Sequence, residues 1–205
     1  IKTTIFKNIE RFLAKRSSGI IAISEIQKKE LCEIHKIAPS KKVKVIPLGF
    51  DLEIFQKNYN ENRIKTRTKY LIDDQTIAIT IVGRITAIKD HHYFLDVIEQ
   101  IHQKCQKKIK IFIVGDGDMK DEIEQRIIPM QNIGIDISLT SWIYDIATFN
   151  AGMDIMCLTS KNEGTPVSLI EAQASNLPVV STDVGGVLDI VEQNETGFII
   201  PRTNK

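Results

Sequence analysis

The chain has 205 residues, of which 42% are hydrophobic and 26% are charged, and its formal net charge is +1. This composition is typical of a folded globular protein, and a charge so close to balance argues against a general nucleic-acid-binding protein. No apolar run reaches the length of a membrane span and no signal peptide is visible, so we expect a cytoplasmic protein. Because the chain begins with Ile1 rather than Met, we also expect a piece of a longer protein.

The cysteines argue against a disulfide framework and against a zinc site. Cys32, Cys105 and Cys157 lie far apart, form no Cys-x-x-Cys pair and have no paired histidines nearby. We therefore expect a reducing environment, no bound metal and no other cofactor.

The first segment predicts an amphipathic helix that needs a partner surface. Its apolar residues recur at helical spacing, and Lys7, Arg11 and Lys15 lie on another side. Such a helix could lie on an anionic membrane or pack against a neighbouring domain. We favour packing, and keep peripheral contact with the inner face of the membrane, through the N-terminal domain, as the alternative. The apolar residues are Ile5, Phe6, Ile9, Phe12 and Leu13.

Short apolar runs alternate with segments of helical periodicity along the whole chain. Ser24 is a candidate N-cap before the periodic segment 25–35, and Asp90 is a candidate N-cap before a segment in which Phe94 and Ile98 recur at helical spacing. This alternation predicts a Rossmann-like α/β fold, a parallel sheet with helices on both faces. The runs expected to form strands are 19–23, 43–48, 77–82, 109–114, 135–139, 153–158, 178–181 and 198–200.

A change in composition suggests a boundary between two domains. Gly49 and Phe50 lead into the polar stretch 56–62, so we place a linker over residues 49–62. Residues 51–205 are numerous enough for a complete domain. Residues 1–50 are too few to bury both faces of a small sheet, so we interpret them as the C-terminal remnant of a preceding domain.

The segment from Glu163 to Glu171 carries the strongest functional signal. Thr165 predicts an N-cap and Pro166 the first turn of an apolar helix. The free N–H groups and the positive end of such a helix favour an anion, most simply a phosphate. Glu163 and Glu171 could accept hydrogen bonds from hydroxyl groups on either side of it. A nucleotide sugar has this layout, although a loop charge and a solvated helix carboxylate would produce the same pattern.

A second candidate anion site follows the predicted strand 77–82. Arg84 and Lys89 lie on the loop that begins at Gly83 and enters the next helix. Arg84 can bind phosphate oxygens bidentately, and Lys89 adds a mobile point charge. Taken alone, these residues are more simply interpreted as solvated loop charges.

Two other loops carry weaker signals. Gly115 and Gly117 follow a predicted strand, but Lys120 stands where a dinucleotide-binding motif has its third glycine, so a tight strand-to-helix turn explains them more simply. Trp142, the only tryptophan, shares a loop with Ile143 and could lie beside a base, although packing at the rim of the core is the simpler role.

His91 and His92 stand at the start of a predicted helix. No second acid or nucleophile of suitable spacing accompanies them. We therefore assign them no catalytic role.

In order and spacing, these motifs resemble the donor half of the retaining glycosyltransferases of family 4. The resemblance covers nearly the whole chain, because 21–24 and 46–51 are similar to the segments that close the family's first domain. One departure is Asp90, which stands where many members have glycine. The segments that carry the resemblance are Gly83-Arg84 with Lys89, Gly115-Asp116-Gly117, the Trp142 loop, Glu163 through Glu171, 178–180 and Gly185-Gly186.

The resemblance implies the C-terminal half of a two-domain GT-B fold, with the donor bound between the domains. Residues 51–205 would be the donor-binding domain, lacking the family's final crossing helix, and residues 1–50 would belong to the acceptor-side domain. Arg84 and Lys89 would neutralise the donor diphosphate without a metal. Glu171 would bind ribose hydroxyls, and Glu163 would bind the transferred sugar.

The implied catalytic residues are therefore Arg84, Lys89 and Glu163. The other implied residues bind substrate, and backbone N–H groups around Thr165 and Val167 would complete the phosphate site. These substrate-binding residues are Gly83, Gly115, Trp142, Ile143, Gly164, Thr165, Pro166, Val167 and Glu171.

The implied function is transfer of a hexose or N-acetylhexosamine, with retention of configuration, to a saccharide or lipid acceptor. The pathway would be polysaccharide, lipopolysaccharide or glycolipid biosynthesis. The variant Glu163-Gly164-Thr165-Pro166-Val167, in place of the more common Glu-Gly-Phe-Gly-Leu, favours a UDP-linked donor. Because the acceptor domain's functional residues are absent from this sequence, we expect this chain to bind the donor but not to transfer the sugar.

Other functions could use the same features. A nucleotide-sugar epimerase on this fold would need an acid and a base at the sugar ring, and the sequence offers no convincing pair. A second alternative is a non-catalytic nucleotide-binding subunit, and it would be favoured if the full-length protein bound a nucleotide but transferred no sugar. A glycoside hydrolase ranks last, because a helix end that binds diphosphate has no purpose there.

Overall fold

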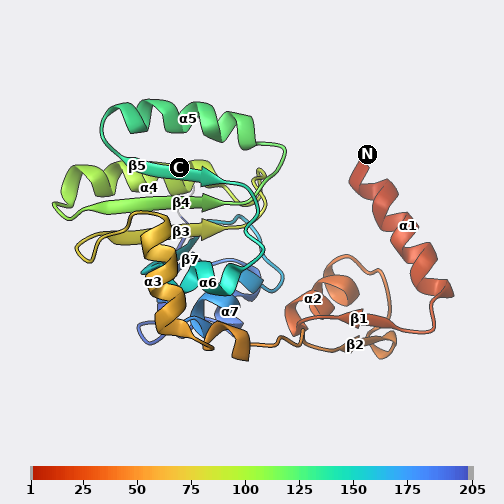
Figure 1. The fold of residues 1–205 in the computed structure, drawn as a ribbon. Helices are drawn as coiled ribbons and strands as arrows, with labels where there is room; N and C mark the ends of the chain where they lie inside the picture. Colours follow the sequence, from red (N-terminus) through yellow and green to blue (C-terminus); the bar gives the residue numbers. More distant parts are fainter. Residues whose placement is uncertain (1, 203–205) are drawn as a thin grey trace. The chain divides into compact units, whose positions relative to one another are not determined.

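The computed structural model describes residues 2–202, and Figure 1 shows its helices and strands. The chain divides into two compact units, with the boundary between Phe50 and Asp51. Within the described residues, no helix combines the length and the apolar character that crossing a membrane requires.

The smaller unit contains a long helix and a pair of short parallel strands with a helix between them. Ile20 pairs with Val43 in the sheet. Ser24 caps the intervening helix as predicted, because its Oγ accepts a hydrogen bond from the N–H of Gln27 at 3.1 Å. The predicted single helix over 25–35 changes from α to π geometry halfway. The elements are α1 (Lys2–Arg16), β1 (Ile20–Ala22), α2 (Glu25–Lys29), a π-helical turn (Glu30–Ile34), a 3-10 turn (Ser40–Lys42) and β2 (Val43–Val45).

The apolar face of α1 lies outside the core of this unit. Its side chains are exposed, from 48% at Ile9 to 64% at Phe6. Among the described side chains of α1, only Ala14 is buried. The smaller unit therefore presents an apolar helix face that no other described residue of this unit covers. The core consists of Ala14, Ala22, Ile37, Ala38 and Val43.

The larger unit is built on a six-stranded sheet, parallel throughout, in the order β5-β4-β3-β6-β7-β8. This confirms the predicted fold class. β3 and β4 occupy their predicted ranges, and the other four strands lie within two residues of theirs. The elements are a 3-10 turn (Glu53–Phe55), α3 (Tyr59–Lys69), β3 (Ile77–Val82), α4 (His91–Lys104), β4 (Ile109–Val114), α5 (Lys120–Asn132), β5 (Asp136–Thr140), α6 (Ile146–Ala151), β6 (Ile155–Leu158), α7 (Val167–Ala174), β7 (Val179–Thr182), a 3-10 segment (Gly185–Asp189) and β8 (Gly197–Ile200).

Helices cover both faces of this sheet. Successive strand residues point to opposite faces, so Ile111 and Phe112 of β4 enter different cores. Ile111 belongs to the core that includes Phe94 of α4 and Ile123 of α5. Phe112 belongs to the core that includes Leu169 of α7 and residues of α6.

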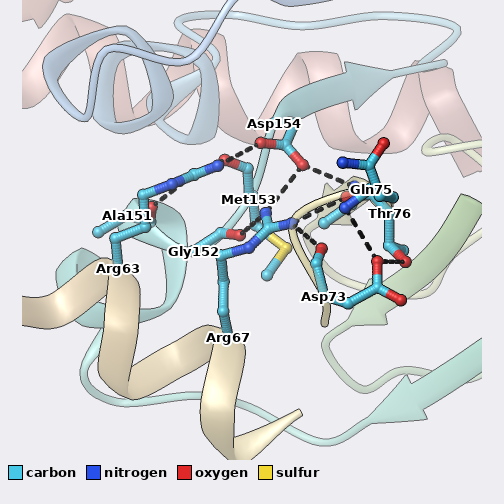
Figure 2. Close-up of polar contacts among 10 residues, drawn as sticks. Arg63, Arg67, Asp73, Gln75, Thr76, Ala151, Gly152, Met153 and Asp154 are labelled. Atoms are coloured by element: carbon cyan, nitrogen blue, oxygen red, sulfur yellow. Dashed lines mark hydrogen bonds and ion pairs between the residues drawn. The ribbon is translucent and has the colours of Figure 1, made fainter. Parts of the chain in front are cut away.

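The prediction of a linker over 49–62 is wrong in its second half, where the structure has the start of a helix, and charged side chains attach this helix to the sheet. The polar stretch includes the start of α3 at Tyr59. The helix was missed because it has almost no apolar periodicity. As Figure 2 shows, two of its arginines reach the carboxylate of Asp154, with Arg63 Nη2 at 2.7 Å from Oδ1 and Arg67 Nη1 at 3.0 Å from Oδ2.

Asp154 is the centre of this network, at the amino ends of β3 and β6. It also accepts the N–H of Ala78 at 2.8 Å. Arg67 is 8% exposed and donates further hydrogen bonds to three backbone carbonyls. Burial by itself would raise the pKa of Asp154, but these hydrogen bonds and the two guanidinium charges outweigh it and hold the pKa below its ordinary value.

We predict that Asp154→Ala lowers the free energy of unfolding by about 2–4 kcal/mol, because it leaves Arg67 buried without its carboxylate. Chemical denaturation followed by the fluorescence of Trp142 measures this in the larger unit. Lys108→Ala is the control, since it removes only an exposed ion pair with Asp73. Equal losses in the two variants would contradict a special role for Asp154.

We also predict that the chain associates with itself through α1, because exposed apolar patches of this kind promote association. Sedimentation velocity should show species larger than the monomer. Ile9→Gln with Leu13→Gln should shift the distribution toward monomer, whereas Glu10→Gln on the same helix should not. A clean monomer with α1 well protected from protease would contradict the prediction.

Candidate functional site

β3 and β6 are neighbours in the middle of the sheet, and the helices that follow them pack on opposite faces. α4, which follows β3, belongs to one core, and α7, which follows β6, belongs to the other. In open parallel sheets, ligands bind at the carboxyl ends of strands where the direction of winding reverses in this way. The loops 83–90 and 159–166 leave this point, and they carry Arg84, Lys89 and Glu163.

Lys89 and Glu163 were predicted from two separate loops, and the structure brings them into contact. Lys89 Nζ lies 2.7 Å from Glu163 Oε1. Ser160 Oγ donates a second hydrogen bond to the same oxygen at 2.5 Å. The side chain of Glu163 is only 9% exposed, and a carboxylate so buried is costly unless donors of this kind pair with it.

The turn that carries Lys89 is attached to the end of β6. Thr159 Oγ1 lies 3.1 Å from the carbonyl oxygen of Lys89 and 3.0 Å from that of Asp90. The N–H of Lys161 donates to the carbonyl of Ile88 at 2.7 Å. Residues directly after β6 therefore determine where the turn after β3 lies.

Asp90 has a left-handed backbone, with φ of +49°. Glycine adopts this conformation without strain and Asp tolerates it, so the backbone at this position accommodates either residue. The Asp90 side chain caps α4 as predicted, accepting the N–H of Tyr93 at 3.4 Å. Its other oxygen, Oδ2, lies 2.5 Å from Arg202 Nη2.

Gly115 and Gly117 allow the loop after β4 to touch the loop after β3. A Cβ on Gly115 would lie 2.0 Å from the carbonyl oxygen of Gly83, and one on Gly117 would lie 2.2 Å from that of Ile85. Gly115 also has φ of +146°, which disfavours other residues. Close backbone packing thus accounts for both glycines.

The Trp142 loop follows β5 at the same edge of the sheet. Trp142 is 49% exposed, and its ring edge lies against Gly115. Ile143 is partly buried against the core. Of these two predicted residues, only Trp142 presents substantial surface.

Gly185 and Gly186 press the loop after β7 onto the loop of Glu163. A Cβ on Gly185 would lie 1.7 Å from the carbonyl oxygen of Glu163, and one on Gly186 would lie 2.1 Å from that of Gly164. The N–H of Gly186 donates to the carbonyl of Glu163 at 3.3 Å. The backbone around Glu163 is therefore held from a second strand end.

α7 begins one residue later than predicted. Pro166 is the N-cap, with φ of −74° and a non-helical ψ of 88°, so Thr165 lies before the cap. The carbonyl of Pro166 accepts the N–H of Leu169 at 3.0 Å. The N–H groups of Val167 and Ser168 have no acceptor among the described residues, so the start of the helix offers free donors.

The side chains of Arg84 and Glu171 have no hydrogen-bond or ion-pair partner within residues 2–202, so neither is bonded to Lys89 or Glu163. Arg84 is exposed, whereas Glu171 is partly buried in α7. Burial raises the pKa of Glu171 above its ordinary value. In the same part of the chain, no three His, Cys, Asp or Glu side chains cluster closely enough to hold a metal ion.

His91, to which we assigned no catalytic role, is buried beside Lys89. It is 2% exposed, and neither ring nitrogen has a partner among the described residues. Burial, together with the charge of Lys89, lowers the pKa of His91 to about 4. The ring is therefore neutral at neutral pH and adds no charge to the site.

Three residues at this edge of the sheet were not singled out from the sequence. The Thr159 hydroxyl bonds the backbone carbonyl of Asp90, and the Ser160 hydroxyl bonds the carboxylate of Glu163. Arg202, which follows β8, bonds the carboxylate of Asp90. A signal for the first two existed, because hydroxyl residues directly after a buried apolar strand lie at the ligand-binding edge. Nothing in the sequence connects Arg202 with Asp90.

Comparison with known proteins relates the chain to sugar-transferring enzymes. The model of the glycosyl transferases group 1 matches residues 76–205. The UDP-Gal:alpha-D-GlcNAc-diphosphoundecaprenol alpha-1,3-galactosyltransferase of Escherichia coli is 28% identical over 197 residues, 96% of this chain and 50% of the relative. The capsular polysaccharide biosynthesis glycosyltransferase CapM of Staphylococcus aureus is 29% identical over 195 residues, 91% of this chain and 49% of the relative.

The fold is also that of solved glycosyltransferase structures. Anabaena Alr3699/HepE, in complex with UDP and glucose, superposes with a TM-score of 0.83 at 23% identity, over 95% of this chain and 52% of that chain. The chain spans about half the length of the curated relatives it matches. Because the family model matches more than half of its residues and its sheet is that of the GT-B neighbours, the chain belongs to the glycosyl transferases group 1.

Proposed function

We propose that residues 51–205 bind a UDP-linked sugar and that residues 1–50 are the end of the acceptor-side domain. The full-length protein would transfer a hexose or N-acetylhexosamine, with retention of configuration, to a saccharide or lipid acceptor. In this proposal Arg84 and Lys89 bind the diphosphate, Glu163 binds the sugar and Glu171 binds the ribose.

The observation that carries the proposal is the meeting of Lys89 with Glu163 at the reversal between β3 and β6. A cation suits a phosphate, and a buried carboxylate suits sugar hydroxyls. The free N–H groups at the start of α7 belong to Val167 and Ser168, the fourth and fifth residues after Glu163, and supply further donors for an anion. Charge arranged in advance around a leaving diphosphate is the electrostatic catalysis that sugar transfer needs.

The relatives support the choice of donor and pathway. The name of the E. coli relative specifies UDP-Gal, and the Anabaena structure contains UDP and glucose. The name of the S. aureus relative specifies capsular polysaccharide biosynthesis. These names support UDP as the nucleotide and a surface polysaccharide or a lipid-linked saccharide as the product.

We predict that calorimetric titration of the chain with UDP, GDP and ADP, without added metal, detects binding of UDP. Arg84→Ala and Glu171→Ala should each weaken it about tenfold or more, because each removes a charged partner of the nucleotide. Lys108→Ala is a matched control, since it removes a cation at the amino end of β4 and should leave the affinity unchanged. Absence of binding to a folded sample, or equal losses in all three variants, would contradict the donor site.

A second prediction follows from the unpaired carboxylate of Glu171. The pKa of Glu171 is raised above its ordinary value of 4.5, so its ionised carboxylate lowers the stability of the native state at pH values above the raised pKa. This loss of stability disappears below about pH 4.5, where the carboxyl group is protonated in both the folded and the unfolded state. We expect Glu171→Gln to raise the melting temperature by about 1–3 °C at neutral pH, with a gain that shrinks as the pH falls toward 4.5. Exposed Glu195→Gln is the control, and a lower melting temperature in Glu171→Gln would contradict the argument.

A further inference from the structure

Ser160 is a buried hydroxyl residue at the point where β6 ends. It is 0% exposed, and its Oγ donates to Glu163 Oε1 at 2.5 Å. Its own carbonyl accepts a hydrogen bond from Thr182 Oγ1 at 2.8 Å, and Thr182 is also fully buried. The Ser160 backbone is therefore bonded to β7, which fixes the position of the Cα atom that carries the hydroxyl side chain.

The two donors to Glu163 converge on one of its oxygens. Lys89 Nζ, at 2.7 Å, and Ser160 Oγ both contact Oε1. Oε2 has no partner among the described residues and retains accessible surface. The carboxylate is thus held through one oxygen and presents the other.

The two donors differ in how firmly they can hold the carboxylate. Lys89 is a long side chain that is 23% exposed, and under the proposed function it also binds the diphosphate. Ser160 has a single side-chain torsion and no solvent exposure. When Lys89 shares its ammonium group with a phosphate, Ser160 is the donor that keeps Glu163 in place.

We infer that Ser160 is a positioning residue for sugar recognition: its hydroxyl fixes Glu163 Oε1, so that Oε2 accepts a hydrogen bond from a hydroxyl of the transferred sugar. This inference rests on the proposed function. It makes a specific statement about ligands, because Ser160 should matter for a nucleotide that carries a sugar and not for the nucleotide alone.

The test is calorimetric titration of the chain and its Ser160→Ala variant with UDP and with UDP-glucose, UDP-galactose and UDP-N-acetylglucosamine. For the sugar nucleotide that binds most tightly, we expect Ser160→Ala to lower the affinity about tenfold, since a hydrogen bond to a charged group is lost. The affinity for UDP should change less than twofold. Glu163→Ala should show the same selective loss, and adding Ser160→Ala to it should cause no further loss.

Ser181→Ala is the matched control. Ser181 is equally buried in the adjacent strand, but within the described residues its hydroxyl makes a single hydrogen bond, to the carbonyl of Thr182. This variant should bind both ligands as the unmodified chain does, and melting curves should show that every variant is folded.

The outcomes separate this inference from the proposed function. If the unmodified chain binds UDP and a sugar nucleotide but Ser160→Ala weakens both equally or neither, the positioning role is overturned and the donor site stands. If no sugar nucleotide binds more tightly than UDP, the sugar contact of Glu163 is overturned and Ser160's role falls with it. If UDP itself does not bind, the proposed function fails.

Discussion

The pairing of β3 with β6 is the constraint on which the rest of the site depends. These two strands are far apart in sequence but adjacent in the sheet, and their following helices leave toward opposite faces. Two loops that would otherwise be unrelated therefore begin side by side. This is how Lys89 and Glu163, 74 residues apart, come to form an ion pair.

The edge at the carboxyl ends of the strands is assembled mainly by backbone contacts. Gly115 and Gly185 stand where a side chain would collide with a neighbouring loop, and Asp90, the residue after Lys89, adopts a left-handed backbone. Buried hydroxyl groups of Thr159 and Ser160 then tie the two charged loops to the end of β6. Since few of these groups can move without disturbing another strand end, the charged side chains extend from a rigid base.

In the part of the chain that the structure describes, Asp154, at the amino end of the sheet, is paired with charged partners, whereas Arg84 and Glu171, at the carboxyl end, are not. At the amino end, Asp154 is fully paired with Arg63, Arg67 and a backbone N–H, which secures α3. At the carboxyl end, Arg84 and Glu171 have no partner within the described residues. Arg84 is exposed to solvent, but the partly buried carboxylate of Glu171 reduces stability, and proteins accept such a loss where a ligand provides the missing partner. The unpaired, partly buried carboxylate of Glu171 therefore supports a ligand site at the carboxyl end.

The amino-acid sequence by itself determined the fold class, because strands buried on both faces must be continuous apolar runs and helices must repeat at their own period. It also placed Arg84, Lys89, Glu163 and the glycines directly after strands, where a parallel sheet gathers its ligand-binding groups. The sequence did not predict α3, because polar contacts with Asp154 hold that helix and its residues show almost no apolar periodicity. Only the tertiary structure decided that Lys89 and Ser160 share one oxygen of Glu163, that α7 starts at Val167 and that Arg202 reaches Asp90. The contacts of Lys89 with Glu163 and of Arg202 with Asp90 join segments distant in sequence, so they depend on strand order. The Ser160–Glu163 bond and the start of α7 are local, and they depend on how their loop packs, which the sequence pattern does not encode.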